Sequence, residues 1–219
     1  SCRKMIIAID GPAASGKGTL ARRLADHFDF AYLDTGKLYR AVGLGVLRLG
    51  GDPEDEDAAG DVARNLQPSQ LDDDELKSDA AASAASKVAA IETVRAALLD
   101  FQKSLAANPP GGKKGAILDG RDIGTVVCPD ADVKLFVTAS VEVRAERRHK
   151  ELLQRGETSI YERVLEDLKE RDARDSARAV APLKPAEDAT MVDTSAMDAD
   201  QAFEAALKIA SPAVAEKLR

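Results

Sequence analysis

The chain has 219 residues, 44% of them hydrophobic, which is enough apolar material for one sizeable core. Its formal charge of −7 argues against binding a nucleic-acid polymer, because such binding requires a basic face. Cys2 and Cys128 provide neither a disulfide framework nor the spacing of a zinc site, and we interpret them as unreactive thiols. We expect a cytoplasmic monomer with small-molecule partners, and no apolar run is long enough to span a membrane.

The predicted elements alternate between strands and helices. Short apolar runs predict buried strands at 5–9, 31–33, 116–118, 133–137 and 191–192. Helical spacing and end signals predict helices at 18–28, 37–49, 140–154, 160–179 and 198–209. This alternation is typical of an α/β fold in which helices flank a mostly parallel sheet.

The middle of the chain departs from this alternation. Residues 52–79 are acidic and poor in large apolar side chains, which indicates a surface linker or a small mobile module. Residues 80–107 are rich in alanine and favour helix. We expect a break between Ala90 and Thr93, with Thr93 capping a second helix. Without that break, Ser86 and Arg95 would lie on opposite faces of one helix and could not meet the same ligand.

Residues 11–17 fit the pattern G-x-x-x-x-G-K and lie between a predicted strand and a predicted helix, as a phosphate-binding loop requires. Glycines let backbone N–H groups converge on phosphate oxygens, and the lysine reaches the outer phosphates. A chance glycine-rich turn is the alternative, but the order of strand, loop and helix disfavours it. The predicted nucleotide-binding residues are Gly11, Ala13, Ala14, Ser15, Gly16, Lys17, Gly18 and Thr19.

Gly18 stands where the general motif has a serine or threonine that ligates Mg²⁺. A metal ion at this loop would lose one protein ligand and keep more water molecules, which Mg²⁺ tolerates. We therefore predict no direct protein ligand for the metal, which phosphates and waters would hold. Thr19 is expected to contact the phosphate nearer the nucleoside.

Arginines elsewhere in the chain indicate a second phosphate site. Arg40 and Arg121 follow predicted parallel strands, so they should open onto the same crevice as the phosphate loop. A guanidinium group suits bidentate phosphate binding. Arg171, Arg174, Asp175 and Arg178 lie at i, i+3, i+4 and i+7 and share one helix face. A solvated face or local ion pairs could explain each cluster alone, but their combination favours an anionic ligand.

A second basic stripe is formed by Arg144, Arg147 and Arg148, just before a polar loop around Gly156. Pairing with interleaved glutamates would be an ordinary structural explanation. The functional interpretation is a lid at about 149–160, with Arg147 and Arg148 closing over the phosphates of a donor nucleotide.

Several blocks of the sequence resemble bacterial-type cytidylate kinases. They are 7–19, 33–40, 84–89, 119–127 and 169–182, the last containing Glu-Arg-Asp-Ala-Arg-Asp-Ser-Ala-Arg-Ala-Val-Ala-Pro. The resemblance spans most of the chain in the expected order. It implies a single P-loop kinase domain at 1–219, with its core at about 1–50 and 108–219. The same resemblance implies a reduced monophosphate-binding insert at about 51–107 and a short lid.

The family resemblance also implies a reaction, the transfer of the γ-phosphoryl group of ATP to CMP or dCMP with Mg²⁺. By the matching positions, Lys17, Arg121 and Arg178 would be catalytic. The acceptor phosphate would be held by Arg40, Arg121 and Arg178, and the ribose by Arg171 and Asp175. The remaining acceptor-site residues would be Thr35 and the cytosine readers Ser86, Arg95 and Asp122.

The cytosine assignment has a chemical basis of its own. The exocyclic amine of cytosine can donate a hydrogen bond to a carboxylate such as Asp122. Cytosine also offers acceptors to which Arg95 can donate. Uracil presents an oxygen in place of that amine, so the carboxylate would face another acceptor.

Two other functions remain as alternatives. Another P-loop kinase, for adenylate or a metabolite, would share Gly-Lys-Gly-Thr but would not require the arginine-rich helix face together with Gly120-Arg121-Asp122. A non-enzymatic nucleotide switch would usually have Ser or Thr at position 18 and an Asn-Lys-x-Asp guanine reader, which we do not find.

Overall fold

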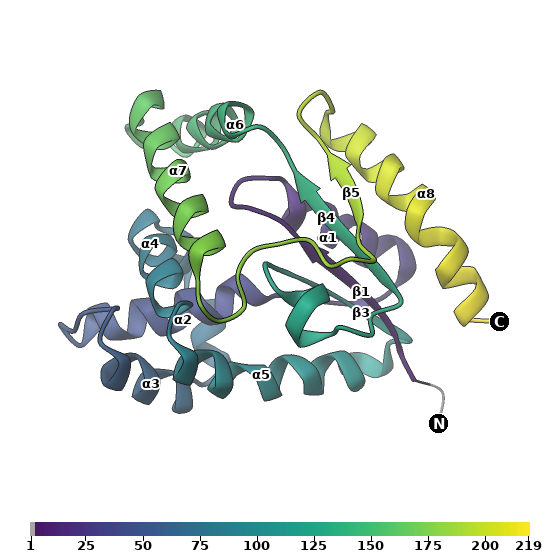
Figure 1. Cartoon of the computed structure of the whole chain (residues 1–219), viewed down its shortest axis with the longest axis horizontal. Coiled ribbons are helices and arrows are strands. Elements are labelled where there is room, and N and C mark those ends of the chain that lie inside the picture. The colour runs from purple at the N-terminus through teal and green to yellow at the C-terminus, as the bar shows by residue number, and fades with distance from the viewer. Residues whose placement is uncertain (1–2) are drawn as a thin grey trace.

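The computed structural model describes residues 3–219, so Cys2 lies outside the described residues. Within them, five parallel strands form one sheet in the order β2-β3-β1-β4-β5. This confirms the predicted α/β fold with a parallel sheet (Figure 1). The strands are β1 (Met5–Asp10), β2 (Ala31–Asp34), β3 (Gly115–Gly120), β4 (Val133–Thr138) and β5 (Thr190–Asp193).

Helices cover both faces of the sheet because its strands are apolar on both sides. Along β1, Ile7 and Ile9 pack toward α1 (Lys17–Phe28) and α8 (Ala199–Lys217). Ile6 and Ala8 pack on the opposite face, toward α2 (Thr35–Arg48) and α5 (Glu92–Ala107). Helix α8 runs past the predicted end at Ile209 and accommodates Pro212 within it. No helix among the described residues combines the length and apolar character needed to cross a bilayer.

A pair of helices, α6 (Val141–Gln154) and α7 (Tyr161–Ala177), lies beyond the end of β4 (Figure 1). Ser140 begins α6 as predicted, because its hydroxyl accepts a hydrogen bond from the Val143 backbone N–H at 3.3 Å. Helix α7 ends one residue before Arg178, whose backbone is extended. Arg178 therefore leaves the helical stripe that the sequence predicted and approaches the site from the segment that follows.

The acidic segment 52–79 is helical and packed, so the prediction of a surface linker was wrong, and its alternative of a small mobile module stays a prediction. It contains α3 (Glu56–Arg64) and short 3₁₀ turns at Pro68–Asp72 and Asp74–Lys77. Small residues make this packing possible, because Ala59 and Ala63 are buried in the core shared with α5. The few large apolar side chains also contribute, because Leu76 is buried and Leu66 and Leu71 pack against the core.

The predicted break between two alanine-rich helices is confirmed, but its cap was assigned to the wrong residue. Helix α4 (Asp79–Val88) ends before α5 begins, and the residue preceding α5 is Ile91 rather than Thr93. Ile91 is buried in the core, which fixes the turn without a polar cap. The Arg95 guanidinium donates to the Ala89 carbonyl at 2.9 Å and so satisfies an acceptor at this break.

The close contact between α2 and α4 generates a stability prediction. A Cβ added at Gly43 would lie 2.8 Å from the backbone carbonyl carbon of Ala84, whereas one added at Gly45 would meet only the Val62 side chain at 2.8 Å. We expect Gly43→Ala to lower the free energy of unfolding by about 1–3 kcal/mol, measured by urea denaturation. Gly45→Ala is the matched control and should cost less, because Val62 can move. Equal effects would contradict the close-packing explanation.

Candidate active site

The phosphate loop is shaped by close backbone contacts. A Cβ at Gly11 would lie only 2.0 Å from the Val137 carbonyl oxygen, so no larger residue fits. Gly16 has a φ of +85°, in the region that favours glycine, and it directly precedes α1. This turn places Lys17 at the start of the helix, where the N-terminal dipole favours anions.

Lys17 is buried, and its ammonium group donates to the Pro12 carbonyl at 3.3 Å. Burial lowers the pKa of Lys17 from 10.5 to about 7, and the nearby guanidinium groups of Arg121 and Arg171 contribute to this shift. The Asp119 and Asp34 carboxylates oppose this shift but do not cancel it.

A cleft with a volume of about 530 Å³ lies between the phosphate loop, α4, α6 and α7. Most of its charged side chains are cationic, although four carboxylates from α4, α6 and α7 also line it. The cationic residues are Lys17, Arg40, Lys77, Arg121, Arg148, Arg155, Arg171 and Arg174. This concentration of positive charge is suited to the phosphates of a nucleotide.

A second cavity adjoins this cleft and contains nearly all of the predicted acceptor residues. They are Thr35, Ser86, Arg95, Arg121, Asp122, Arg171, Asp175 and Arg178. Arg40 lines the larger cleft instead and lies 3.7 Å from the Asp34 carboxylate. Arg121 and Arg171 line both spaces, so the two cavities meet at these side chains.

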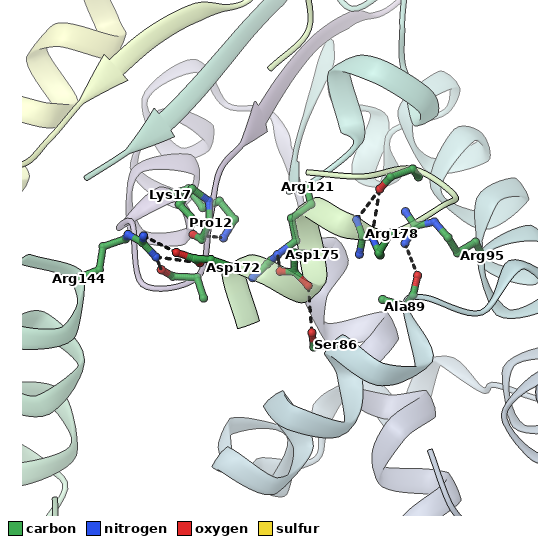
Figure 2. A network of polar contacts seen from close by, with 12 residues as sticks. Pro12, Lys17, Ser86, Ala89, Arg95, Arg121, Arg144, Asp172, Asp175 and Arg178 are labelled. Atoms are coloured by element: carbon green, nitrogen blue, oxygen red, sulfur yellow. Dashed lines mark hydrogen bonds and ion pairs between the residues drawn. The ribbon is translucent and has the colours of Figure 1, made fainter. Parts of the chain in front are cut away.

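Asp175 lies at the centre of the polar contacts in this second cavity (Figure 2). It accepts hydrogen bonds from the Ser86 hydroxyl at 3.0 Å and from Arg121 Nε at 2.9 Å. Burial by itself would raise the pKa of Asp175, but the charges of Arg121, Arg171 and Arg178 outweigh burial and lower it. Asp175 is thus an ionised, buried anchor, which excludes the solvated-face explanation of its helix.

Arg95 and Asp122 form a buried ion pair in the same cavity. The Arg95 guanidinium also lies over the Tyr39 ring, with its carbon 5.2 Å from the ring centre. Arg178 Nε and Nη2 donate to the Ala181 carbonyl at 3.1 and 2.6 Å, so one edge of that guanidinium is already occupied. These contacts hold the side chains of Arg95 and Arg178 in defined orientations. Figure 2 shows both arginines, with the bond from Arg95 to the Ala89 carbonyl.

The structure separates the two arginines that the sequence assigned together to the donor phosphates. Arg148 lines the large cleft and pairs with Asp79 and with Glu151. Arg147 donates to the Thr194 hydroxyl at 3.0 Å and lines a different cavity of about 200 Å³. Consecutive helical residues point about 100° apart, and this explains the divergence. The smaller cavity also contains Ser15, Gly16 and Thr19.

Arg144, the third member of that stripe, has a structural role. It is buried, and its Nη1 and Nη2 bond to the two oxygens of Asp172 on α7 at 3.1 and 2.6 Å. Its Nη1 also donates to the Ala13 carbonyl of the phosphate loop at 3.2 Å. Arg144 therefore ties α6 and α7 to the loop (Figure 2).

Sequence reasoning missed three carboxylates, Asp10, Asp34 and Asp119. They lie at the carboxyl ends of β1, β2 and β3, and this position after a buried run was the available signal. Asp34 pairs in register with Asp119, and both influence the charge of Lys17. Burial raises the pKa of Asp119 to about 6, and the Asp34 charge adds to this effect.

Asp10 has a different task from the other two carboxylates. Its two oxygens accept hydrogen bonds from the backbone N–H groups of Ile123 and Gly124, both at 2.8 Å. Those residues directly follow Arg121 and Asp122. Asp10 therefore connects β1, which enters the phosphate loop, with the loop that carries Arg121 and Asp122.

The displaced pKa of Lys17 generates a prediction about stability and pH. Between pH 7 and 10.5 the unfolded chain holds a proton that folded Lys17 has lost, so this group makes the fold more stable as pH rises. We expect Lys17→Met to stabilise the nucleotide-free protein by about 1 kcal/mol or more at pH 6.5, and by less at pH 9.5. Thermal unfolding at both pH values measures this. Lys37→Met, which changes an exposed lysine, is the control. A lower melting temperature for Lys17→Met at pH 6.5 would contradict the prediction.

Comparison with known proteins identifies the family. A family model described as cytidylate kinase matches residues 7–212. Curated cytidylate kinases from Paramagnetospirillum magneticum and Rhodospirillum rubrum are 66% and 63% identical, covering 93% and 94% of this chain and 96% of each relative. A solved structure of an uncharacterized protein from Eubacterium ventriosum covers 94% of this chain and 97% of its own, with a TM-score of 0.54 and 14% identity, and supports the fold alone. The chain therefore belongs to the cytidylate kinase family of phosphotransferases.

Proposed function

We propose that this chain transfers the γ-phosphoryl group of ATP to CMP or dCMP, producing ADP and CDP or dCDP. The observation that carries the proposal is the junction of two cavities at Arg121 and Arg171. A nucleotide in each cavity could bring its terminal phosphate to the same two guanidinium groups. This end-to-end arrangement is the one that direct phosphoryl transfer requires.

The donor nucleotide would lie along the phosphate loop. Its polyphosphate would accept hydrogen bonds from backbone N–H groups of the loop and from the Lys17 ammonium. Arg148 lines the same cleft. The cavity beside Thr19 and Arg147 would take the nucleoside. Polyphosphate binding would also favour the protonated form of Lys17, because it supplies the negative charge that the empty site lacks.

The acceptor would occupy the cavity around Asp175. Arg40, Arg121 and Arg178 would hold its phosphate, and Arg171 with Asp175 its ribose. Asp122 and Arg95 would read the cytosine edge, with Ser86 beside them. The Arg95–Asp122 ion pair supports this role, because it presents an acceptor and a donor next to one another in a buried place.

The chemistry needs positioning and charge more than a reactive side chain. An oxygen of the CMP phosphate attacks the γ-phosphorus, and the bond from that phosphorus to the ADP oxygen breaks. The attacking phosphate is already an oxygen nucleophile, so no general base is required. Lys17, Arg121 and Arg178 would neutralise charge on the transferred group. Helices α6 and α7 border the cleft and would help to exclude water.

Mg²⁺ fits the residues present at this site. Asp34 and Asp119 offer oxygen donors, which Mg²⁺ prefers, next to Lys17. When bound, the ion would neutralise phosphate charge and help to orient the donor. We infer that these carboxylates act on its water ligands and that nucleotide phosphates complete its coordination.

The proposal predicts a defined acceptor preference. Wild-type protein with Mg²⁺ and ATP should turn over CMP and dCMP faster than UMP or AMP in an ADP-release assay. Lys17→Met should lower turnover with CMP by about 10³-fold or more, because one centre of positive charge is lost at the transferred group. Lys37→Met should remain near wild type. Faster turnover of AMP than of CMP would refute the proposed substrate.

Base recognition gives a separate prediction. Asp122→Asn replaces an obligatory acceptor by a group that can also donate, so it can pair with uracil. We expect the ratio of kcat/KM for CMP over UMP to fall about tenfold, within the roughly 1–3 kcal/mol of one mismatched buried polar group. Steady-state kinetics with both acceptors measures the ratio. An unchanged ratio would place cytosine recognition on other residues.

A further inference from the structure

We propose that Tyr32 is a positioning residue that holds the Asp119 carboxylate beside the phosphate loop, where it acts toward the metal–nucleotide complex. The inference rests on the proposed function and assigns a task to a residue that the reaction scheme above leaves unused. Its observable basis is one hydrogen bond, the sheet register and the space beside Gly18.

The Tyr32 hydroxyl donates to Asp119 Oδ2 at 2.5 Å. The two residues come from neighbouring strands, in which Tyr32 pairs with Ile117 and Asp34 pairs with Asp119. Alternate residues of a strand point to the same face, so Tyr32, Asp34 and Asp119 share the face of the sheet that packs on α1. Ile117 packs in the core cluster of that face, with Tyr32 against it.

Gly18 lies directly beside this pair. A Cβ added at Gly18 would be 3.7 Å from the Tyr32 hydroxyl and 3.9 Å from Asp119 Oδ2, which are ordinary contact distances. The general loop motif places its metal-binding hydroxyl at this position. In this protein the oxygen atoms near position 18 are the Tyr32 hydroxyl of β2 and the Asp119 carboxylate of β3.

Asp119 is buried beside a like charge, and the hydrogen bond from Tyr32 sets the orientation of its carboxylate. Asp34 lies opposite it in register, and mutual repulsion would turn the two carboxylates apart. Tyr32 occupies Oδ2 and leaves Oδ1 for a water molecule of the metal. The Tyr32 ring packs against the core cluster on this face of the sheet, and the Arg22 guanidinium carbon of α1 lies 5.7 Å from the ring centre. Outer-sphere partners of this kind orient the groups that act on a metal.

A metal titration tests the assignment without relying on turnover. Protein saturated with ADP is titrated with Mg²⁺, and the added thermal stabilisation gives a half-saturating Mg²⁺ concentration. We expect Tyr32→Phe to raise that concentration about tenfold, while the stabilisation by ADP alone stays at the wild-type value. Tyr161→Phe removes the hydroxyl of a ring that packs edge-on against His149 and is the matched control. Its titration should follow wild type.

A double variant distinguishes positioning from a general structural effect. Asp119→Asn should raise the Mg²⁺ requirement by itself, and adding Tyr32→Phe should change it no further, because Tyr32 acts through Asp119. An unchanged requirement in Tyr32→Phe, or additive effects in the double variant, would overturn the proposal. If Tyr32→Phe fails to fold, an unchanged requirement in Asp119→Asn still overturns it. The titration contains no CMP, so failure of the proposed acceptor would appear only in the turnover assay.

Discussion

The buried Asp175 carboxylate is the contact on which the rest of the site depends. It bonds to Arg121 and Ser86 and is surrounded by Arg171 and Arg178, with almost no exposure to water. Like charges at such short range repel, and in a buried place the repulsion is poorly screened. One ionised carboxylate among these guanidinium groups reduces their mutual repulsion. Helix α7 supplies it.

Even with Asp175, the site holds more positive charge than it can neutralise. The pKa of Arg171 falls to about 9, chiefly by burial and then by the Arg121 charge, and its Nε is buried without a partner in the described residues. The pKa of Lys17 is lowered by the same causes, burial first and then the Arg121 charge. A fold that tolerates such strain without ligand would gain stability when phosphate oxygens enter. Phosphate binding is then favoured by this excess of positive charge.

The carboxylates have three distinct tasks, set by what each one contacts. Asp175 organises cations, Asp10 accepts backbone N–H groups and so shapes the loop behind Arg121, and Asp119 lies beside Lys17 with Tyr32 holding it. A phosphate loop that lacks a hydroxyl at position 18 is consistent with this division. The Tyr32 hydroxyl and the Asp119 carboxylate of the sheet lie next to Gly18, where the loop itself has no side chain.

Elements whose signals are local could be predicted from the amino-acid sequence alone. Apolar runs located every strand among the described residues, and the glycine pattern located the loop around Lys17. Residue types together with family resemblance selected arginines that the fold brings to two adjoining cavities. The packing of segment 52–79 could not be predicted in this way, because its alanines and its few leucines gain burial through contacts with distant elements that composition does not reveal. The tertiary structure also separated Arg147 from Arg148 and brought Tyr32 to Asp119. Such contacts depend on the direction in which each side chain leaves its element and on the register between strands distant in sequence.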